Sequence, residues 1–459
     1  MDAVAAIPGI LAILWLLRRR TPQETYLSIY MPSLLLLPGW CRFVLPALPD
    51  PTFHESAILP IAAALFLRGR IKWRTSLLDL LVVAYGLFIG YSEYTNAGFK
   101  EAQNLMFDMV AAALVPYFAA QAMAGSAELR VAFAKRFVWL VAILACLLTY
   151  EFRFAANPYR VVFDHFFPDQ GSGWVTTFRY GFARIAGPYG HAILAGIVFM
   201  AAFRLARWLQ HAKLWEPHLA WAGKRFSKAQ LVTGATLAGL AMTLVRGPQI
   251  GALLACLVSA MGRGQNPPRR ARFVLAAILL IGIPAGTVAW SYASVGRAAA
   301  KDASQESAAY RKELIDKYVG IALDHAALGW GRNGWPKVPG MPSIDNYYLL
   351  LSLMHGVPAA LLLMSILVTL QANLLRNGFR FVTEFQTNSS LSFTLAGIFA
   401  GFMFAILTVY MGDNVVPIFF TLAGFSEGYL KAGGDAAVNP VADSAAPEIA
   451  QALFARVIA

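Results

Sequence analysis

The chain contains 459 residues, of which 58% are hydrophobic and only 14% are charged, and its mean hydropathy is +0.56. Soluble domains are about 45–50% apolar, so this composition excludes an ordinary soluble protein. The net charge of +13 does not indicate nucleic-acid binding, because the basic residues stand at alternate ends of the apolar segments, which is the positive-inside pattern of membrane proteins. The sequence therefore predicts an all-α polytopic membrane protein, and its long continuous apolar runs exclude a β-barrel.

The apolar segments recur from end to end and predict about 12–13 transmembrane helices, since a bilayer requires roughly 17–25 apolar residues per helix. In chain order the predicted spans are 2–17, 25–48, 55–68, 76–95, 103–123, 130–150, 185–203, 229–245, 247–262, 273–293, 345–370, 390–410 and 413–430. The first run could instead lie in the membrane interface, which accounts for the lower number.

When the chain crosses the membrane at each predicted span in turn, every basic cluster falls on the cytoplasmic side. Residues 1–431 then form a single transmembrane domain, and residues 432–459 form a cytoplasmic tail whose composition predicts disorder. Two large loops, 151–183 and 294–343, remain on the outer side. Within the second loop, Gln305–His325 carries apolar residues at helical spacing and is predicted to form an amphipathic helix.

Two arginines stand at the outer ends of predicted spans. Arg184 begins the segment Arg184–His191, and Arg246 precedes Gly247 and Pro248 within a long apolar stretch. Pro248 suits the first turn of a helix, whose free N–H groups beside a cation would bind an anion. Charge is costly near a bilayer, so arginines in such places usually face a cavity and bind a ligand. The alternative is that each side chain reaches the membrane interface and has no further role.

A third group of candidate residues lies in and after the second outer loop. Trp330 and Trp335 stand in a glycine-rich stretch, where their rings could stack on sugars or anchor the loop at the membrane interface. Asp345 begins a predicted span, where it could form a helix N-cap, and this role does not exclude a second role in chemistry. Asp108, near the outer end of another span, is a further candidate. The three cysteines lie in apolar spans and are interpreted as core residues without metal-ligand spacing.

The order of these motifs resembles the O-antigen ligase and Wzy-type O-antigen polymerase family of bacterial envelope glycosyltransferases. The resemblance covers residues 180–370, and its matching stretches are Arg184–Gly187, Val245–Gly247, Tyr310-Arg311, Leu328–Gly331, Asp345–Leu349 and His355–Pro358. It implies a GT-C-like architecture in the bacterial inner membrane, an active site that faces the periplasm, and catalysis without a metal ion or other cofactor.

The resemblance also implies the reaction and its site. A sugar hydroxyl attacks the anomeric carbon of a glycan linked to undecaprenyl pyrophosphate, and the pyrophosphate leaves. Arg184 and Arg246 are the predicted pyrophosphate ligands, and Asp345 is the predicted base. From the residues alone, a solvated helix face is the favoured interpretation of Arg311, and only the resemblance makes it a site residue. A lone histidine such as His191 is more often a core residue than a catalyst. The predicted substrate-binding residues are Arg311, Arg332, Asn346, Tyr347, His191 and Trp330.

Asp345 departs from the family pattern, because the ligases carry a histidine at this position. An aspartate can accept a proton but cannot act as a cationic partner of a phosphate. This difference favours a polymerase of exopolysaccharide or O-antigen repeat units, which uses a lipid-linked glycan as donor and a second glycan as acceptor.

Three alternatives to the polymerase stay open. The first is a ligase that transfers the glycan to lipid A core or another acceptor. The second is a flippase for lipid-linked sugars, although a transporter would place its notable charges near the membrane midplane. The third is a scaffolding protein. Membrane lipids and proteins of polysaccharide export are the further partners that the resemblance leaves open, and nucleic acid is not among them.

Overall fold

The computed structural model describes residues 2–435 except 46–48, 70–73, 169, 171–174, 216–218, 222–223, 263–266, 382–389 and 413. The described chain is a bundle of helices with two short antiparallel β-hairpins. Six of its helices are long and apolar enough to cross a membrane, and three further apolar helices are shorter. The prediction of an all-α polytopic membrane protein is therefore confirmed. The total of about 12–13 spans stays a prediction. The tail was predicted at residues 432–459, of which 436–459 lie outside the described residues.

The helices and strands have the following bounds. The six candidate spans are α5 (Leu77–Ala97), the continuous helix Phe99–Ala124, α8 (Ala127–Phe154), α10 (Ala192–His211), α13 (Pro267–Ala293) and α16 (Val357–Phe381). The helix Phe99–Ala124 comprises α6 (Phe99–Asp108), a π-helical turn (Met109–Leu114), α7 (Val115–Gln121) and a 3-10 turn (Ala122–Ala124). The other helices are α1 (Ile7–Leu17), α2 (Pro22–Thr25), α3 (Met31–Leu36), α4 (Phe53–Leu67), α9 (Pro158–Phe166), α11 (Lys228–Met242), α12 (Arg246–Ala260), α14 (Ala303–Asp324), α15 (Tyr347–His355), α17 (Leu391–Ala405) and α18 (Val415–Lys431). The strands are β1 (Phe178–Arg179), β2 (Phe182–Ala183), β3 (Leu219–Trp221) and β4 (Lys224–Phe226).

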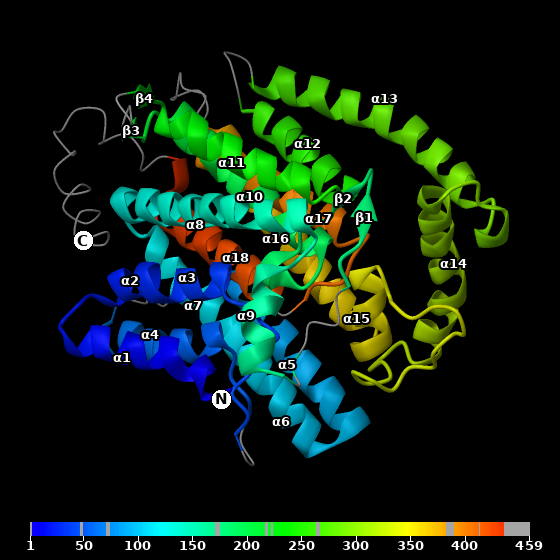
Figure 1. The fold of residues 1–459 in the computed structure, drawn as a ribbon, viewed down its shortest axis with the longest axis horizontal. Coiled ribbons are helices and arrows are strands. Elements are labelled where there is room, and N and C mark those ends of the chain that lie inside the picture. The colour runs from blue at the N-terminus through cyan, green and yellow to red at the C-terminus, as the bar shows by residue number, and fades with distance from the viewer. Residues whose placement is uncertain are drawn as a thin grey trace.

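Helix α10 lies inside the bundle, where it contacts α8, α11, α12 and α17 (Figure 1). Most of its residues are buried. Close helix packing in membranes depends on small residues that let backbones approach. Between α12 and α17, a Cβ added at Gly251 or at Gly401 would lie 3.1 or 3.0 Å from the carbonyl oxygen of the other residue. Glycine at both positions therefore lets these two helices pack backbone against backbone.

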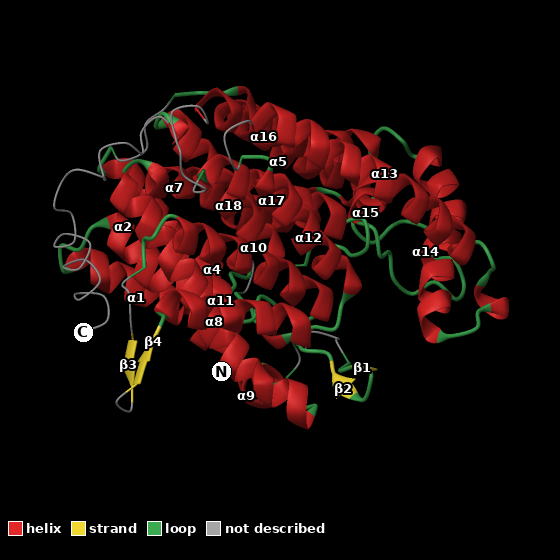
Figure 2. Cartoon of the chain, turned by 90° about the horizontal axis from the view of Figure 1, so that it is seen from above, coloured by secondary structure: helices red, strands yellow, loops and turns green. Residues whose placement is uncertain are grey.

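The bundle has two ends with different contents. At the first, which we call the basic end, Nζ of Lys431 donates to Oδ2 of Asp79 over 2.5 Å and to Oε1 of Gln121 over 3.0 Å. The second, which we call the loop end, carries β1, β2, α14 and α15 (Figure 1). Figure 2 shows from a second direction that α14 runs across this end rather than along the bundle. Both loops that were predicted to lie on the outer side therefore share one end of the molecule.

The amphipathic helix predicted at Gln305–His325 is confirmed as α14. Its residues Leu314 and Tyr318 pack against Ile344 in the following loop and against Leu349 in α15. This small apolar cluster is separate from the main core of the bundle. Helix α14, the loop after it and α15 therefore form one packed unit at the loop end.

The span predicted at 185–203 is wrong in its start, because α10 begins at Ala192. Gly187 and Gly190 adopt positive φ values of 56° and 68°, which break the helix and favour glycine. His191 is consequently the N-cap residue of α10 and does not lie two turns inside a span. Arg184 correspondingly lies in a loop ahead of the span and not in its first turn.

Two other predicted spans are shorter than expected. The span predicted at 25–48 ends as a helix at Leu36. The span predicted at 345–370 is divided into α15 and α16 at Gly356, which has a φ of 85°. A Cβ at Gly356 would lie 2.6 Å from the carbonyl oxygen of Ala327, so the loop after α14 passes directly against this break. Because of this break, α15 is a separate short helix at the loop end and does not continue into α16.

Replacing Gly356 by alanine should lower the thermal unfolding temperature of the purified protein. A side chain at this positive φ costs about 1–3 kcal/mol, and the added Cβ also meets the backbone of Ala327. Gly282→Ala is the matched control, since no atom lies within 4 Å of a Cβ built there. Equal losses of stability in the two variants would contradict this account of the break.

Candidate active site

Arg184 is held by a tight β-hairpin at the loop end. Strands β1 and β2 pair antiparallel, and the turn between them has positive φ at Tyr180 (54°) and Gly181 (80°), as in the favoured two-residue hairpin turns. Arg184 extends this ladder, because its N–H donates to the carbonyl of Thr177 over 2.9 Å. Its Nη1 also donates to Oγ1 of Thr177 over 3.1 Å. Paired residues of antiparallel strands project to the same face, so Thr177 and Arg184 share one face of the hairpin.

Arg179 is a second arginine on this face, and the sequence interpretation missed it. It lies two residues from Thr177 along the strand, which returns its side chain to the same side. Its Nη1 donates to the carbonyl of Leu244 over 2.7 Å and so ties the hairpin to the turn between α11 and α12. The alternation of Thr177 and Arg179 ahead of a Tyr-Gly turn was the signal that could have identified it.

Arg311 approaches the same place from α14. Its Nη1 donates to the carbonyl and to Oγ of Ser307, over 3.2 and 2.9 Å. Burial lowers the pKa of Arg311. The negative charge of Asp345 acts in the opposite direction and raises this pKa, whereas the positive charge of Arg179 lowers it further. Burial together with Arg179 and Arg311 lowers the pKa of Arg184 to about 10. The charges of Arg179 and Arg311 both act on Arg184, so we define the cationic cluster as Arg179, Arg184 and Arg311.

Asp345 is the carboxylate that accompanies the cationic cluster. Its Oδ1 accepts a hydrogen bond from Oγ of Ser343 over 2.9 Å. The interpretation of Asp345 as a helix N-cap is wrong, because the cap of α15 is Asn346, whose side chain accepts from the N–H of Leu349. The capping role therefore belongs to the neighbouring residue, and the negative charge of Asp345 acts on Arg311.

His191 lies near the cationic cluster, whereas Tyr347 lies in the main core. Nδ1 of His191 accepts from the N–H of Ile193 over 3.1 Å, which requires that nitrogen to be unprotonated. Burial, followed by the charges of Arg184 and Arg311, lowers the pKa of His191 to about 4. Tyr347 is buried in the main core, and its hydroxyl lies 3.4 Å from that of Tyr85. His191 is thus a neutral neighbour of the cations, and Tyr347 anchors the start of α15.

Arg246 begins α12 as predicted, but it points toward the hairpin tip. Its side chain is exposed, and Nη2 lies 3.5 Å from the hydroxyl of Tyr180. Within the described part of the chain, no contact joins its guanidinium to Arg184 or Arg311. Arg246 therefore stands beside the hairpin that carries Arg179 and Arg184.

Arg332 and Trp330 lie in a separate group of residues. Arg332 pairs with Asp108 over 3.6 Å and with Glu101 over 3.8 Å, and its N–H donates to Glu93 over 2.9 Å. Trp330 stacks on His325, with ring centroids 3.6 Å apart. Asp108 also accepts from Arg42 over 2.9 Å. We call Arg42, Glu93, Glu101, Asp108 and Arg332 the anchoring cluster, because they tie the loop after α14 to α5 and α6.

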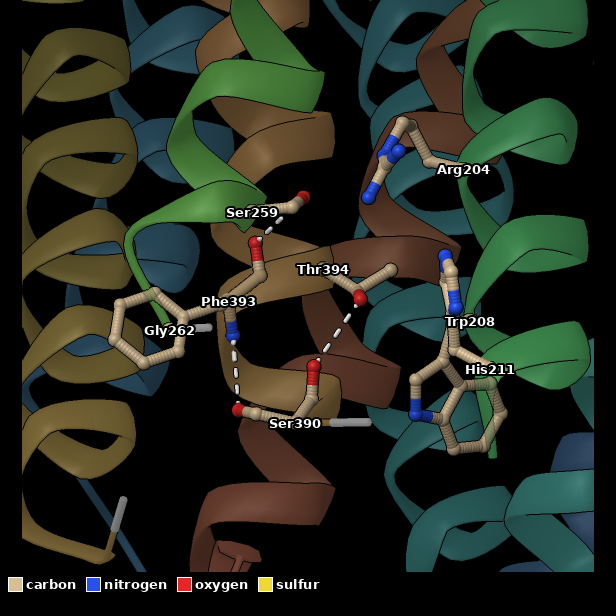
Figure 3. Close-up of a pocket in the computed structure, with 8 residues that line it drawn as sticks. All are labelled: Arg204, Trp208, His211, Ser259, Gly262, Ser390, Phe393 and Thr394. Carbon is tan, nitrogen blue, oxygen red and sulfur yellow. Dashed lines mark hydrogen bonds between the residues drawn. The ribbon is translucent and has the colours of Figure 1, made fainter. Parts of the chain in front are cut away.

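A pocket at the basic end is distinct from both clusters (Figure 3). Arg204 lies twelve residues beyond the start of α10, which is roughly 18 Å along a helix. None of the predicted site residues is in the described lining of this pocket. The lining residues are Arg204, Trp208, His211, Ser259, Gly262, Ser390, Phe393 and Thr394. Among the residues that the structure describes, no group of three or more His, Cys, Asp or Glu side chains could hold a metal ion.

The structure thus defines a helical membrane protein with a cationic cluster, a carboxylate and a crossing helix at one end. A family model described as O-antigen ligase matches residues 231–364. The matched segment runs from α11 into α16 and includes Arg246, Arg311, Arg332 and Asp345, while Arg184 precedes it. This match confirms that the chain is similar to the O-antigen ligase and polymerase family, whose members are glycosyltransferase-like enzymes. No curated protein matches the chain.

Replacing Asn346 by alanine should destabilise the protein, whereas replacing Asp345 should not. Loss of an N-cap costs about 1 kcal/mol, and substitutions outside such features usually stay within about 0.5 kcal/mol. Thermal unfolding of Asn346→Ala and Asp345→Ala in the same detergent measures the difference. An equally large loss in Asp345→Ala would restore a capping role to that residue.

Stability should fall as the pH is lowered from 6.5 toward 4, in part because of His191. Its pKa of about 4 in the folded protein lies below the ordinary value of 6.5. The unfolded chain therefore binds more protons in this window, and acid favours unfolding. His191→Asn keeps a capping side chain but cannot titrate. Unfolding temperatures recorded between pH 7 and 5 should decrease less in His191→Asn than in the wild type, and parallel curves would contradict the assignment.

Proposed function

We propose that this protein polymerises undecaprenyl-pyrophosphate-linked repeat units of an exopolysaccharide or O-antigen at the periplasmic face of the bacterial inner membrane. The observation that carries the proposal is that Arg179 and Arg184 share one face of the hairpin, within electrostatic range of Arg311, which in turn lies within range of Asp345. Cations that repel one another are stabilised by an anion between them, and a pyrophosphate provides several negative charges. The family match supports the same class of reaction.

The cationic cluster suits a departing pyrophosphate. Negative charge grows on the leaving group as the glycosidic bond breaks, so fixed donors stabilise the transition state more than the ground state. Arginine stays protonated under these conditions and offers paired N–H donors to phosphate oxygens. Burial of Arg184 and Arg311 reduces screening by water and strengthens this attraction. Arg246, next to the hairpin tip, contributes a further positive charge on the exposed side.

Asp345 is the base in this proposal. The oxygen of an acceptor sugar hydroxyl forms a bond to the anomeric carbon of the donor, while the bond from that carbon to the pyrophosphate oxygen breaks. The electron pair of the broken bond stays on the lipid pyrophosphate, and the hydroxyl proton passes to the Asp345 carboxylate and then to water. Ser343 holds one carboxylate oxygen, which orients Asp345 for this transfer.

An aspartate at this position favours polymerisation over ligation. The family's ligases carry a histidine here, which can become a second cation for the phosphate. In this chain the cationic role falls to the arginines alone, and the carboxylate next to Arg311 serves proton transfer.

Alanine at Arg184, Arg311 or Asp345 should each reduce polymerisation by about 10²–10³-fold, the usual effect of removing one transition-state contact. The length distribution of glycans on a gel, with membrane insertion measured in parallel, checks this expectation. Lys317→Ala is the matched control, because Lys317 lies on α14 and pairs only locally with Glu313 among the described contacts.

The glycan pattern separates the polymerase from the ligase. Loss of a polymerase leaves single repeat units on the acceptor, whereas loss of a ligase leaves long chains on the carrier lipid. Wild-type ladders from Arg184→Ala would remove the pyrophosphate site from this part of the protein. Long carrier-linked chains would assign the protein to ligation instead.

A further inference from the structure

Glu151 is a fully buried carboxylate behind the hairpin that carries Arg184. It lies in the last turn of α8, and none of its surface is exposed. Its Oε2 accepts hydrogen bonds from the N–H groups of Ala186 over 3.1 Å and Gly187 over 2.9 Å. Both amides are themselves buried, so without this carboxylate they would lose their partner away from water.

The backbone of the segment after Arg184 lies close to α8, so its amides can reach this carboxylate. Gly187 has a φ of 56°, and a Cβ there would lie 2.7 Å from Cδ1 of Leu148 on α8. The positive φ favours glycine at this position, and the missing side chain leaves room for Leu148 where the backbone approaches α8. Nδ2 of Asn157 also donates to the carbonyl of Gly187 over 3.1 Å. The spacing from Arg184 to Gly187 in the sequence is explained by this docking.

Arg184 is consequently fixed from two directions. The hairpin holds its backbone N–H and its guanidinium through Thr177, and Glu151 holds the backbone two and three residues further on. Donors stabilise a transition state only when they are placed before the charge develops. A displacement of about 1 Å can reduce a rate by about 10²-fold.

We propose that Glu151 is a positioning residue, which sets the place of Arg184 in the pyrophosphate site from the end of α8 without touching substrate. The inference rests on the proposed function, since it gives Arg184 its role. Glutamine at this position keeps one acceptor oxygen but replaces the other by an N–H donor, so Glu151→Gln should loosen the segment without removing side-chain volume. Glu151→Asp is the second variant, because it keeps the carboxyl group but withdraws it by one methylene.

A double-mutant cycle tests the proposal. The rate of glycan polymerisation is measured in proteoliposomes with a lipid-linked repeat unit for the wild type, Glu151→Gln, Arg184→Ala and the double variant. We expect Glu151→Gln and Glu151→Asp each to lower kcat at least tenfold while inserting normally. We expect no further loss when Glu151→Gln is added to Arg184→Ala, because the effect of Glu151 passes through that side chain. Glu128→Gln, at the exposed first turn of the same helix, should have the wild-type rate.

Two results would overturn the inference. One is a wild-type rate in both Glu151 variants. The other is an equal fold-loss from Glu151→Gln with and without Arg184, which would make Glu151 a structural residue that acts independently of the site. A wild-type rate in Arg184→Ala has a different meaning, because it would refute the proposed function itself.

Discussion

Three guanidinium groups that repel one another are held together at the loop end of this bundle, and the surrounding structure keeps them there. Arg179 and Arg184 share one face of a hairpin, and Arg311 is brought to them by a helix that runs across the end of the bundle. Burial and mutual repulsion both oppose this arrangement. The same two effects lower the pKa of Arg184, because they disfavour its charged form. A local cost of this kind is typical of a site arranged for a ligand of opposite charge.

The scaffold that offsets this cost is made of short contacts between elements far apart in sequence. The hairpin is tied to the α11–α12 turn through Arg179 and to α8 through Glu151. Helix α14 is tied to α15 through a small apolar cluster around Tyr318. The anchoring cluster around Arg332 connects the intervening loop to α5 and α6. The hairpin, α14 and the loop after α14 are therefore attached to different parts of the bundle. The site consequently forms only when the whole bundle is assembled.

The arrangement separates recognition from the membrane-embedded packing. Close helix contacts such as that of Gly251 with Gly401 depend on small residues and carry no charge. The cationic cluster and Asp345 lie in the hairpin with the residue that follows it, in α14 and just before α15. The pocket at the basic end belongs to another region and shares no residue with the cationic cluster.

The amino-acid sequence by itself determined the fold class, the amphipathic helix α14 and the candidate status of Arg184, Arg311 and Asp345. These features depend on local composition and periodicity, and the family resemblance drew on short motifs. Only the tertiary structure decided that α10 starts at Ala192, that α15 is separate from α16, and that Asn346 rather than Asp345 is the cap. It also identified Glu151 and the contact of Arg179 with Leu244, because Gly187 and Leu244, the partners of Glu151 and Arg179, lie 36 and 65 residues away along the chain. Contacts over such separations depend on how the helices pack, and no local pattern in the sequence encodes them.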